Sequence, residues 1–357
     1  MNQVDRLMHQ AIEDRIFPGG VLLVSRDKQI EFFEAYGCAD LFSGAPVTKD
    51  TIYDLASLTK PLATTLAVMQ LIQESRLSLD QLVVSFLPHF LDPLMSQVTI
   101  RHLLAHSSGL AGYRPYYLNL RQIPLKERKK QLEKMLTQER LVSVPGRQVL
   151  YSDIGFMILR WIIETISGQR LDHFLYEFIY HPLGLERLFF VDLNQQACND
   201  NIAATELCDW RNILLKGKVH DDNAFIMGGI DGHAGLFGSA VDIARMISTL
   251  LSDRRGKSGG SFFNSDLIQV FWSRQTPSGR ALGFDMPSTD GASCGHFFPK
   301  TTVGHLGYTG TSFWIDPERS IFIVLLTNRV HPSRFNVGIR KFRPIIHNQI
   351  MINMYHS

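Results

Sequence analysis

The stretch TSFWIDPERSIFIVLLTNR, residues 311–329, contains two runs of β-branched and aromatic residues on either side of the polar turn IDPERS. This pattern is typical of two antiparallel strands joined by a short connection. A second pair of strands is predicted near the other end of the chain, where VLLVS and IEFFEAYG flank RDKQ within residues 21–37. The segment TTVGHLGY, residues 301–308, adds a further strand. We therefore expect one sheet to be assembled from the two ends of the chain.

The residues between these strands are expected to be mainly helical. From Pro61 to about Leu77 the apolar residues recur at helical spacing. Proline is tolerated best in the first turn of a helix, so this helix must begin near Ser57. Further helices are predicted at the amino end, over a charged run after residue 125, from Asp153 to Gly168, and from about Arg334 to Tyr355. This order of elements predicts the α+β fold class.

Composition excludes several classes of function. Among 357 residues, 36 Lys and Arg face 34 Asp and Glu, and a net charge of +2 gives no field that favours nucleic acid or an anionic membrane. A small molecule or short peptide is the expected partner, with no cofactor. The cysteines are far apart and form no CxxC pair, which favours reduced thiols over a disulfide framework or metal ligands; they are Cys38, Cys198, Cys208 and Cys294.

The amino-terminal residues have an amphipathic helical pattern with charges throughout. A secretory leader needs an uninterrupted apolar run of about 7 to 15 residues, which this pattern lacks. No run of about 18 apolar residues could cross a bilayer either. Unless a leader has been removed, we expect a cytoplasmic protein.

The stretch DLASLTKPLATT, residues 54–65, places Ser57 and Lys60 three positions apart at the start of a core helix, where both project from one face. A serine hydroxyl becomes a nucleophile when a neighbouring base takes its proton, and lysine can serve if its pKa is lowered. The free N–H groups of the helix start can bind an oxyanion. The alternative is that Ser57 only caps the helix and Lys60 is exposed.

Two more stretches strengthen the catalytic interpretation. LYSDIGF places Tyr151 and Asp153 just before a helix, and VGHLGYTG places His305 and Gly307 on a strand, where a glycine allows close approach of substrate to the backbone. In this order the three stretches resemble the SxxK, YxN and KTG signatures of the penicillin-recognising serine hydrolases. Within that group the chain is similar to the class C β-lactamase, DD-peptidase and esterase branch, from PGGVLLVS to SIFIVLLTNRVHP.

The resemblance implies a β-lactamase/transpeptidase-like fold, with an antiparallel sheet covered by helices beside a mainly helical domain. Residues 1–60 and 235–357 would form the α/β domain and residues 61–234 the helical domain, with the catalytic cleft between them. Ser57 would be the acylated nucleophile, Lys60 would share or relay its proton, and Tyr151 would act as general acid and base. Backbone N–H groups of Ser57 and Tyr308 would form the oxyanion hole.

The reference pKa of tyrosine is about 10, so this role of Tyr151 demands nearby cations, for which Lys60 and His305 are the candidates. The alternative is that Tyr151 is an ordinary core aromatic residue.

Two positions depart from the β-lactamase signatures. Asp153 replaces an asparagine with a carboxylate that only accepts hydrogen bonds, so it should stabilise protonated Lys60 and repel a substrate carboxylate. His305 replaces a lysine and is only partly charged at neutral pH, which weakens anchoring of a carboxylate. Efficient β-lactamase action is therefore not expected. Arg329 and Arg334 are the candidates for the missing charge, and the alternative is that both are surface arginines after a strand.

A further group of polar residues lies in VHDDNAFIMGG and DGHAGLFG, which contain His220, Asp221, Asn223 and His233. These residues could line the cleft, and His233 is our candidate for substrate binding together with Asp153, His305, Gly307 and Arg329. Their spacing matches no metal-binding pattern, so no metal site is expected. His106 is predicted to be a structural histidine at a helix end.

The leading hypothesis is a serine hydrolase that cleaves an amide or ester through an acyl-enzyme on Ser57, with peptidoglycan-derived peptides among the candidate substrates. One alternative is a promiscuous carboxylesterase of the same fold. Another is a binding protein that kept the fold without catalysis, although Ser57, Lys60 and Tyr151 are all present. The sequence decides neither the substrate nor the oligomeric state.

Overall fold

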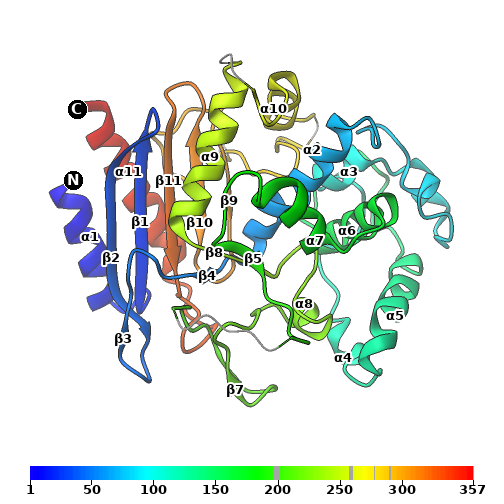
Figure 1. The fold of residues 1–357 in the computed structure, drawn as a ribbon, viewed down its shortest axis with the longest axis horizontal. Coiled ribbons are helices and arrows are strands. Elements are labelled where there is room, and N and C mark those ends of the chain that lie inside the picture. The colour runs from blue at the N-terminus through cyan, green and yellow to red at the C-terminus, as the bar shows by residue number, and fades with distance from the viewer. Residues whose placement is uncertain (196–200, 257–259, 277, 289–290, 357) are drawn as a thin grey trace.

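The largest sheet of the molecule has six antiparallel strands in the order β3-β2-β1-β11-β10-β9 (Figure 1). The computed structural model describes residues 1–195, 201–256, 260–276, 278–288 and 291–356. The strands are β1 (Gly19–Arg26), β2 (Gln29–Asp40), β3 (Ala45–Pro46), β9 (Val303–Leu306), β10 (Ser312–Asp316) and β11 (Ile321–Thr327). Strands from the two ends of the chain meet where β1 pairs with β11. The predicted sheet and the α+β fold class are confirmed.

Both faces of this sheet are buried, because apolar side chains alternate between its two sides along each strand. In β1, Leu22 and Val24 belong to a core shared with α1 (Asn2–Glu13) and α11 (Ile339–His356), whereas Val21 and Leu23 belong to the larger core. Figure 1 shows α1 and α11 on one side of the sheet and α9 (Ala240–Arg254) on the other, with the helical region beyond α9.

The helical region consists of elements between the two sets of strands. Its helices are α2 (Thr65–Gln73), α3 (Ile100–Leu104), α4 (Tyr117–Leu120), α5 (Leu125–Thr137), α6 (Asp153–Ser167), α7 (Leu171–Leu175) and α8 (Asp222–Ile226), and α10 (Ser265–Trp272) follows α9. The α6 helix ends as predicted at Gly168, which has φ of 73°. Glycine adopts this left-handed conformation without the steric penalty of a side chain.

Two helix starts differ from their predictions. The chain forms a 3₁₀ turn at Ala56–Leu58 and a π turn at Lys60–Thr64 before the regular helix α2 begins. The last helix begins at Ile339 and not near Arg334, because the backbone N–H and side chain of Arg334 both bind Glu206. These polar contacts hold the chain outside the helix.

Short strands occur between residues 185 and 240, where mainly helix was expected. One small sheet has the order β4-β8-β5, formed by β4 (Tyr53–Asp54), β8 (Leu236–Gly238) and β5 (Leu188–Phe190), and a hairpin is formed by β6 (Leu207–Cys208) and β7 (Ile213–Leu214). Strands of two or three residues are too short to show a period of two. The first of these sheets matters for the site, since it fixes the residues that precede Ser57. The division into domains at residues 60 and 235 remains a prediction.

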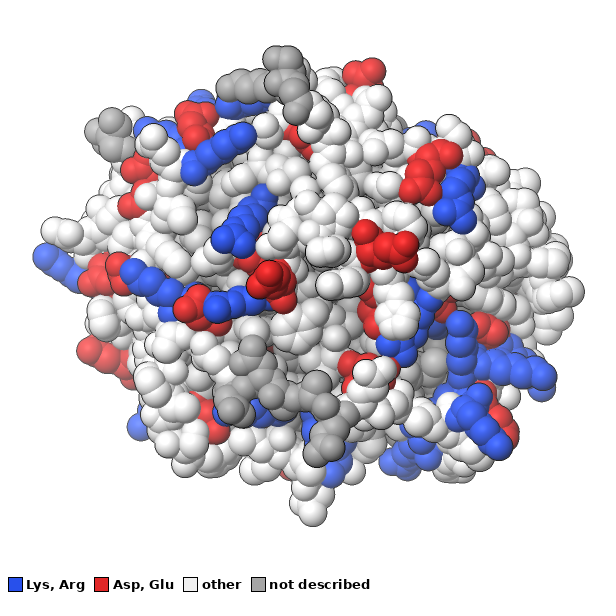
Figure 2. Space-filling view, viewed as in Figure 1, with Lys and Arg blue, Asp and Glu red and all other residues white. Residues whose placement is uncertain are grey.

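The surface carries charges of both signs. On the face shown in Figure 2, basic and acidic side chains alternate over much of the molecule, with basic side chains gathered toward the edge near α4 and α5. No helix in the described ranges is long and apolar enough to span a membrane. Cys38, Cys208 and Cys294 are free thiols, as predicted, and Cys198 lies outside the described residues.

Gly304 in β9 has no room for a side chain. An added Cβ would lie 2.3 Å from the carbonyl oxygen of Phe313 and 2.4 Å from the ring of Trp314. We predict that Gly304→Ala lowers the free energy of unfolding by about 1–3 kcal/mol, as overpacking of a core does. Urea denaturation followed by circular dichroism measures the change.

Gly155→Ala is the matched control for this prediction. Gly155 lies inside α6, and its added Cβ would have no neighbour nearer than 3.6 Å. Alanine is favoured over glycine in a helix by about 0.5–1 kcal/mol, so this variant should be as stable as the unmodified protein or more stable. Equal stability of the two variants would show that β9 tolerates a side chain at this position.

Candidate functional site

The residues before Ser57 form a strained turn that several hydrogen bonds hold in place. Ala56 has φ of 47°, in the left-handed region that a residue with a Cβ adopts at a cost of about 1–2 kcal/mol. The buried carboxylate of Asp54 accepts from the N–H of Ala56 at 2.9 Å and from the N–H of His220 at 2.6 Å. The N–H of Leu55 donates to the carbonyl of Leu236 in β8 at 2.9 Å. The turn is thereby fixed to the small sheet.

Lys60 is fully buried, and its ammonium contacts three segments of the chain. Nζ lies 3.1 Å from Ser57 Oγ, 2.7 Å from Asp153 Oδ1 and 3.0 Å from the carbonyl oxygen of His233. Burial lowers the pKa of Lys60, but the charge of Asp153 outweighs it and raises the pKa above its ordinary value. Lys60 is therefore a protonated donor in the resting site. The interpretation of Lys60 as an exposed residue is wrong.

Tyr151 completes this group. The Lys60 ammonium lies 4.9 Å from the centre of its ring, and the Tyr151 hydroxyl interacts with both Lys60 and Ser57. Burial raises the pKa of Tyr151, and the neighbouring Lys60 opposes this shift without cancelling it. The phenol is therefore neutral at pH 7.

His305 does not supply the second cation that the sequence analysis expected beside Tyr151. The rings of the two residues are 6.0 Å apart, but burial lowers the pKa of His305 well below its ordinary value. His305 Nδ1 donates to the carbonyl of Leu306 at 2.9 Å, which leaves Nε2 unprotonated. The additional cation is Arg280, whose guanidinium lies 5.5 Å from the centre of the Tyr151 ring. Arg280 belongs to no motif, and no sequence signal identified it.

His106 has the structural place predicted for it, directly after α3. Its Nδ1 accepts from the N–H of Ser152 at 3.0 Å, and its ring lies 4.5 Å from that of Tyr151. Burial lowers the pKa of His106 well below its ordinary value, so the ring is neutral and can accept this bond. His106 thereby positions the segment that carries Tyr151.

The corner between β9 and β10 packs against the turn at Ser57. Thr309 Oγ1 donates to the carbonyl of Asp54 at 2.7 Å, and Thr311 Oγ1 donates to that of Leu55 at 3.1 Å. A Cβ at Gly307 would lie 2.6 Å from the carbonyl oxygen of Leu55. The missing side chain therefore makes room for the turn before Ser57 and not for a substrate. The N–H of Tyr308 has no acceptor among the described residues. It is free to bind an oxyanion.

A cavity of about 440 Å³ opens in front of Ser57. Of the predicted site residues, it is lined by Ser57, Tyr151, Asp153, His233 and Tyr308, and also by Tyr113, Asp221 and Arg334. Residues His305, Gly307 and Arg329 do not line it.

Arg329 and Arg334 have different surroundings. The Arg329 guanidinium stacks on the ring of Tyr308 at 4.5 Å and donates to the carbonyls of Tyr308, Arg334 and Asn336. Arg334 reaches the cavity, but Glu206 at 2.6 Å and Asp222 at 3.3 Å balance its charge. Arg329 is therefore held by backbone carbonyls outside the cavity and Arg334 by two carboxylates, so neither is available to a substrate carboxylate.

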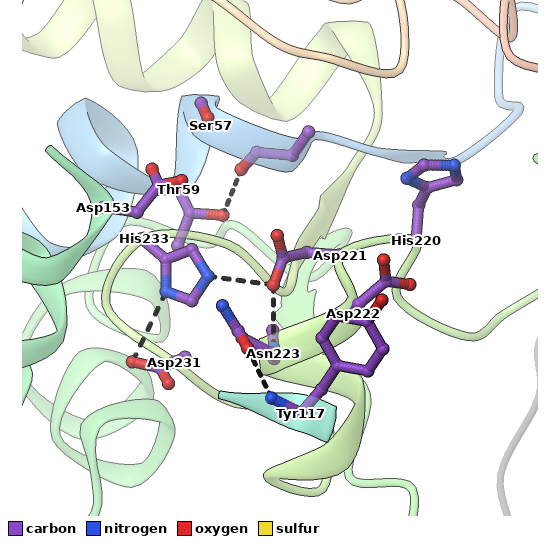
Figure 3. A network of polar contacts seen from close by, with 12 residues as sticks. Ser57, Thr59, Tyr117, Asp153, His220, Asp221, Asp222, Asn223, Asp231 and His233 are labelled. Carbon is purple, nitrogen blue, oxygen red and sulfur yellow. Dashed lines mark hydrogen bonds and ion pairs between the residues drawn. The ribbon is translucent and has the colours of Figure 1, made fainter. Parts of the chain in front are cut away.

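Behind the cavity, opposite charges alternate from His233 toward the surface. His233 lies between two carboxylates, with Nε2 at 2.9 Å from Asp221 and Nδ1 at 3.6 Å from Asp231 (Figure 3). Burial lowers the pKa of His233, but the two carboxylates outweigh it and raise the pKa to about 10. Asp231 pairs with Arg160 at 3.1 Å, and Arg160 pairs with Glu164 at 3.1 Å.

Asp231, Arg160 and Glu206 were not identified from the sequence, because the pairs Arg160–Asp231 and Arg334–Glu206 join remote parts of the chain. No group of three or more His, Cys, Asp or Glu side chains in the described part of the chain could hold a metal ion.

Comparison with known proteins places this geometry in context. A sequence model of the family described as Beta-lactamase matches residues 4–343. The chain is 35% identical over 361 aligned residues to an Escherichia coli K12 protein provisionally named D-alanyl-D-alanine carboxypeptidase, with 93% of this chain and 82% of that protein covered.

Two solved structures are similar in fold. EstCE1, a hydrolase with promiscuous acyltransferase activity, has a TM-score of 0.72 and 23% identity, with 96% of this chain and 98% of that chain covered. The octameric penicillin-binding protein homologue from Pyrococcus abyssi has a TM-score of 0.72 and 22% identity, with 97% and 77% covered. At such identities these likenesses show the fold alone.

The buried neutral histidines should make the free energy of unfolding depend on pH. His106 and His305 cannot bind a proton in the folded state, whereas the unfolded chain binds one at each below its pKa of about 6.5. The free energy of unfolding should therefore fall by up to about 1.4 kcal/mol per pH unit for each of them as the pH drops from about 6 to 5. His233 has the opposite shift, so its contribution is complete below about 6.5 and is lost only as the pH rises through about 10.

Denaturant unfolding at several pH values measures this slope. His305→Gln should make the slope shallower, whereas His296→Gln, which removes an exposed imidazole, should not change it. A stability that does not vary between pH 7 and 5 would contradict the neutral state of the two buried rings.

Proposed function

The chain belongs to the beta-lactamase family of serine hydrolases and has its fold, and we propose that it cleaves an amide or ester through an acyl-enzyme on Ser57. The proposal depends on one observation. Ser57 Oγ lies 3.1 Å from Lys60 Nζ, the ring of Tyr151 lies 4.9 Å from the same ammonium, and Ser57 and Tyr151 both line a cavity.

In the proposed first step, Ser57 Oγ attacks the carbonyl carbon and its proton passes to the Lys60 and Tyr151 pair. The N–H groups of Ser57 and Tyr308 bind the oxyanion. The carbon–nitrogen or carbon–oxygen bond then breaks, and the pair returns the proton to the leaving group. In the second step water attacks the acyl group and gives a proton to the pair, and the pair passes this proton to Ser57 Oγ as the acid leaves.

The resting protonation state limits the rate of this chemistry. Lys60 is charged and Tyr151 is neutral at pH 7, so the form that can accept a proton is the pair after loss of one proton. The two groups are strongly coupled and titrate as a unit. The reaction should therefore accelerate as the pH rises.

The substrate proposed first is an amide in a short peptide, of which peptidoglycan fragments are one source. The support is the similarity to the Escherichia coli protein with the provisional name of a carboxypeptidase. A carboxylesterase remains the second candidate, and the likeness to EstCE1, which extends to the fold alone, does not favour it. A non-catalytic role is disfavoured by the assembled Ser57, Lys60 and Tyr151. A cytoplasmic location remains a prediction from the sequence.

A fluorophosphonate probe tests the nucleophile. We predict that it labels the protein on Ser57 and that Ser57→Ala lowers the labelling rate and the hydrolysis of p-nitrophenyl butyrate by about 10³-fold or more, as loss of a nucleophile does. The control is Ser96→Ala, which removes an exposed serine outside the cavity. Labelling that persists in Ser57→Ala would refute the proposed acyl-enzyme.

The ion pair between Lys60 and Asp153 should set the pH dependence of kcat/KM. Asp153 raises the pKa of Lys60 and that of Tyr151, so its removal should lower both. We predict that kcat/KM for a neutral ester rises with pH above 7 and that Asp153→Asn shifts this rise downward by about one pH unit or more. Asp80→Asn, which removes an exposed carboxylate outside the cavity, should leave the profile in place. An unshifted profile in Asp153→Asn would show that Asp153 does not set the pKa of the pair.

A further inference from the structure

We propose that this site selects substrates that carry a positively charged amine close to the scissile carbonyl, an inference that rests on the proposed function and names its substrate class. The observation behind it concerns the walls of the cavity. Two carboxylates reach the cavity with one oxygen each that has no donor in the described chain, and the side chains of the cations that hold them, Lys60 and His233, are only 0% and 1% exposed.

Asp153 presents the first of these oxygens. Its Oδ1 is bound to Lys60 at 2.7 Å, whereas no described donor contacts Oδ2, and 19% of the side chain is exposed. Lys60 itself has an exposure of 0%. Because the same ammonium contacts Ser57, the Asp153 carboxylate lies within two hydrogen-bond lengths of Ser57 Oγ. A group bound at this oxygen is therefore next to the reacting atoms.

Asp221 presents the second oxygen. Its Oδ1 accepts from His233 Nε2 at 2.9 Å and from the N–H of Ala224 at 2.8 Å, whereas Oδ2 has no described donor. Figure 3 shows one oxygen of Asp221 bound to His233 and the other pointing away from the ring. The side chain of Asp221 is 23% exposed and that of His233 only 1%. The carboxylate is thus fixed from behind and open in front.

The protonated His233 also keeps Asp221 ionised. Burial raises the pKa of Asp221, but the charge and hydrogen bond of His233 outweigh it and lower the pKa below its ordinary value. Asp231 and Arg160 in turn balance His233. A buried ion-pair network therefore holds the Asp221 carboxylate at the wall of the cavity. A carboxylate on the open surface would need no such network.

The other charged and aromatic residues of the cavity agree with a cationic ligand. Arg334 is the exposed cation of the lining, and its guanidinium is occupied by Glu206 and Asp222. Tyr113 is half exposed and lies in the field of Asp153, Asp221 and Asp222, which together with burial raise the pKa of its hydroxyl. An aromatic face beside carboxylates is a favourable surface for an ammonium group.

An ammonium group has three donors and no acceptor, so it can donate to a free carboxylate oxygen and cannot pair with the arginine. A substrate carboxylate would meet like charges at the same place. A cavity of about 440 Å³ accommodates a small peptide or amino-acid derivative. The chemistry therefore points to aminoacyl amides or esters with a free amine.

The test compares three boronic acids that form reversible adducts with a serine nucleophile and differ only at nitrogen. They are 1-aminoethylboronic acid, its neutral N-acetyl derivative and its anionic N-succinyl derivative, each competing at pH 7 with fluorophosphonate labelling of Ser57. We expect the free amine to bind at least about 10-fold more tightly than the acetyl derivative, and the succinyl derivative to bind most weakly. Equal binding of the three, or tightest binding of the succinyl derivative, overturns the inference.

Variants identify the groups responsible. Asp221→Asn and Asp153→Asn should each reduce the ratio of amine to acetyl affinity about 10-fold, whereas Asp80→Asn, with the same change of charge outside the cavity, should retain it. An unchanged ratio in both cavity variants also overturns the inference. The comparison in the unmodified protein stands even if a variant fails to fold.

The two proposals fail differently. Ser57-dependent labelling without preference for the amine refutes the substrate class and leaves the acyl-enzyme in place. Absence of Ser57-dependent labelling refutes the proposed function itself, and the inference with it.

Discussion

The buried ammonium of Lys60 is the interaction on which the rest of this site depends. A charge with no access to water must be paired and hydrogen-bonded, or it costs several kcal/mol. Its three acceptors belong to Ser57, Asp153 and the carbonyl of His233, which come from three distant parts of the chain. The ammonium therefore does more than assist chemistry: it ties the turn after β4, the start of α6 and the loop before β8 to one point. Removal of any one acceptor would leave the charge partly unsatisfied.

The strain at Ala56 is tolerated for the same reason. A left-handed alanine before the nucleophile persists only where its surroundings determine the backbone more strongly than its own preference does. Here the Asp54 carboxylate, the β4-β8 pairing and the threonines of the β9-β10 corner all bind the same turn. The glycine at 307 lets that corner approach. The sheet thus serves as the rigid support of the nucleophile. The close packing found in β9 continues into the corner that contacts the turn at Ser57.

The sequence predicted those parts of the fold and site that depend on local patterns. Runs of β-branched and aromatic residues identified the strands at both ends, and motif residues identified Ser57, Lys60 and Tyr151. Strands of two or three residues such as β4 and β8 were missed, because they form only when a remote partner is present. Arg280 was missed for a similar reason, since it reaches Tyr151 only through the folded chain. The sequence could not show which of Arg329 and Arg334 reaches the cavity. Arg334 is held by Glu206, which is remote along the chain and belongs to no local pattern.

Specificity and reactivity are electrostatically coupled at Asp153. As long as its carboxylate faces Lys60 alone, it holds the proton on the lysine and opposes ionisation of Tyr151, which makes the resting pair a poor base. A cation that approaches the free oxygen Oδ2 attracts the same negative charge and adds its own positive field beside the pair, and both effects lower the pKa of Lys60 and of Tyr151. A neutral or anionic ligand has no such effect. The replacement of an asparagine by Asp153 therefore links the activation of the nucleophile to the charge of the group that occupies the cavity.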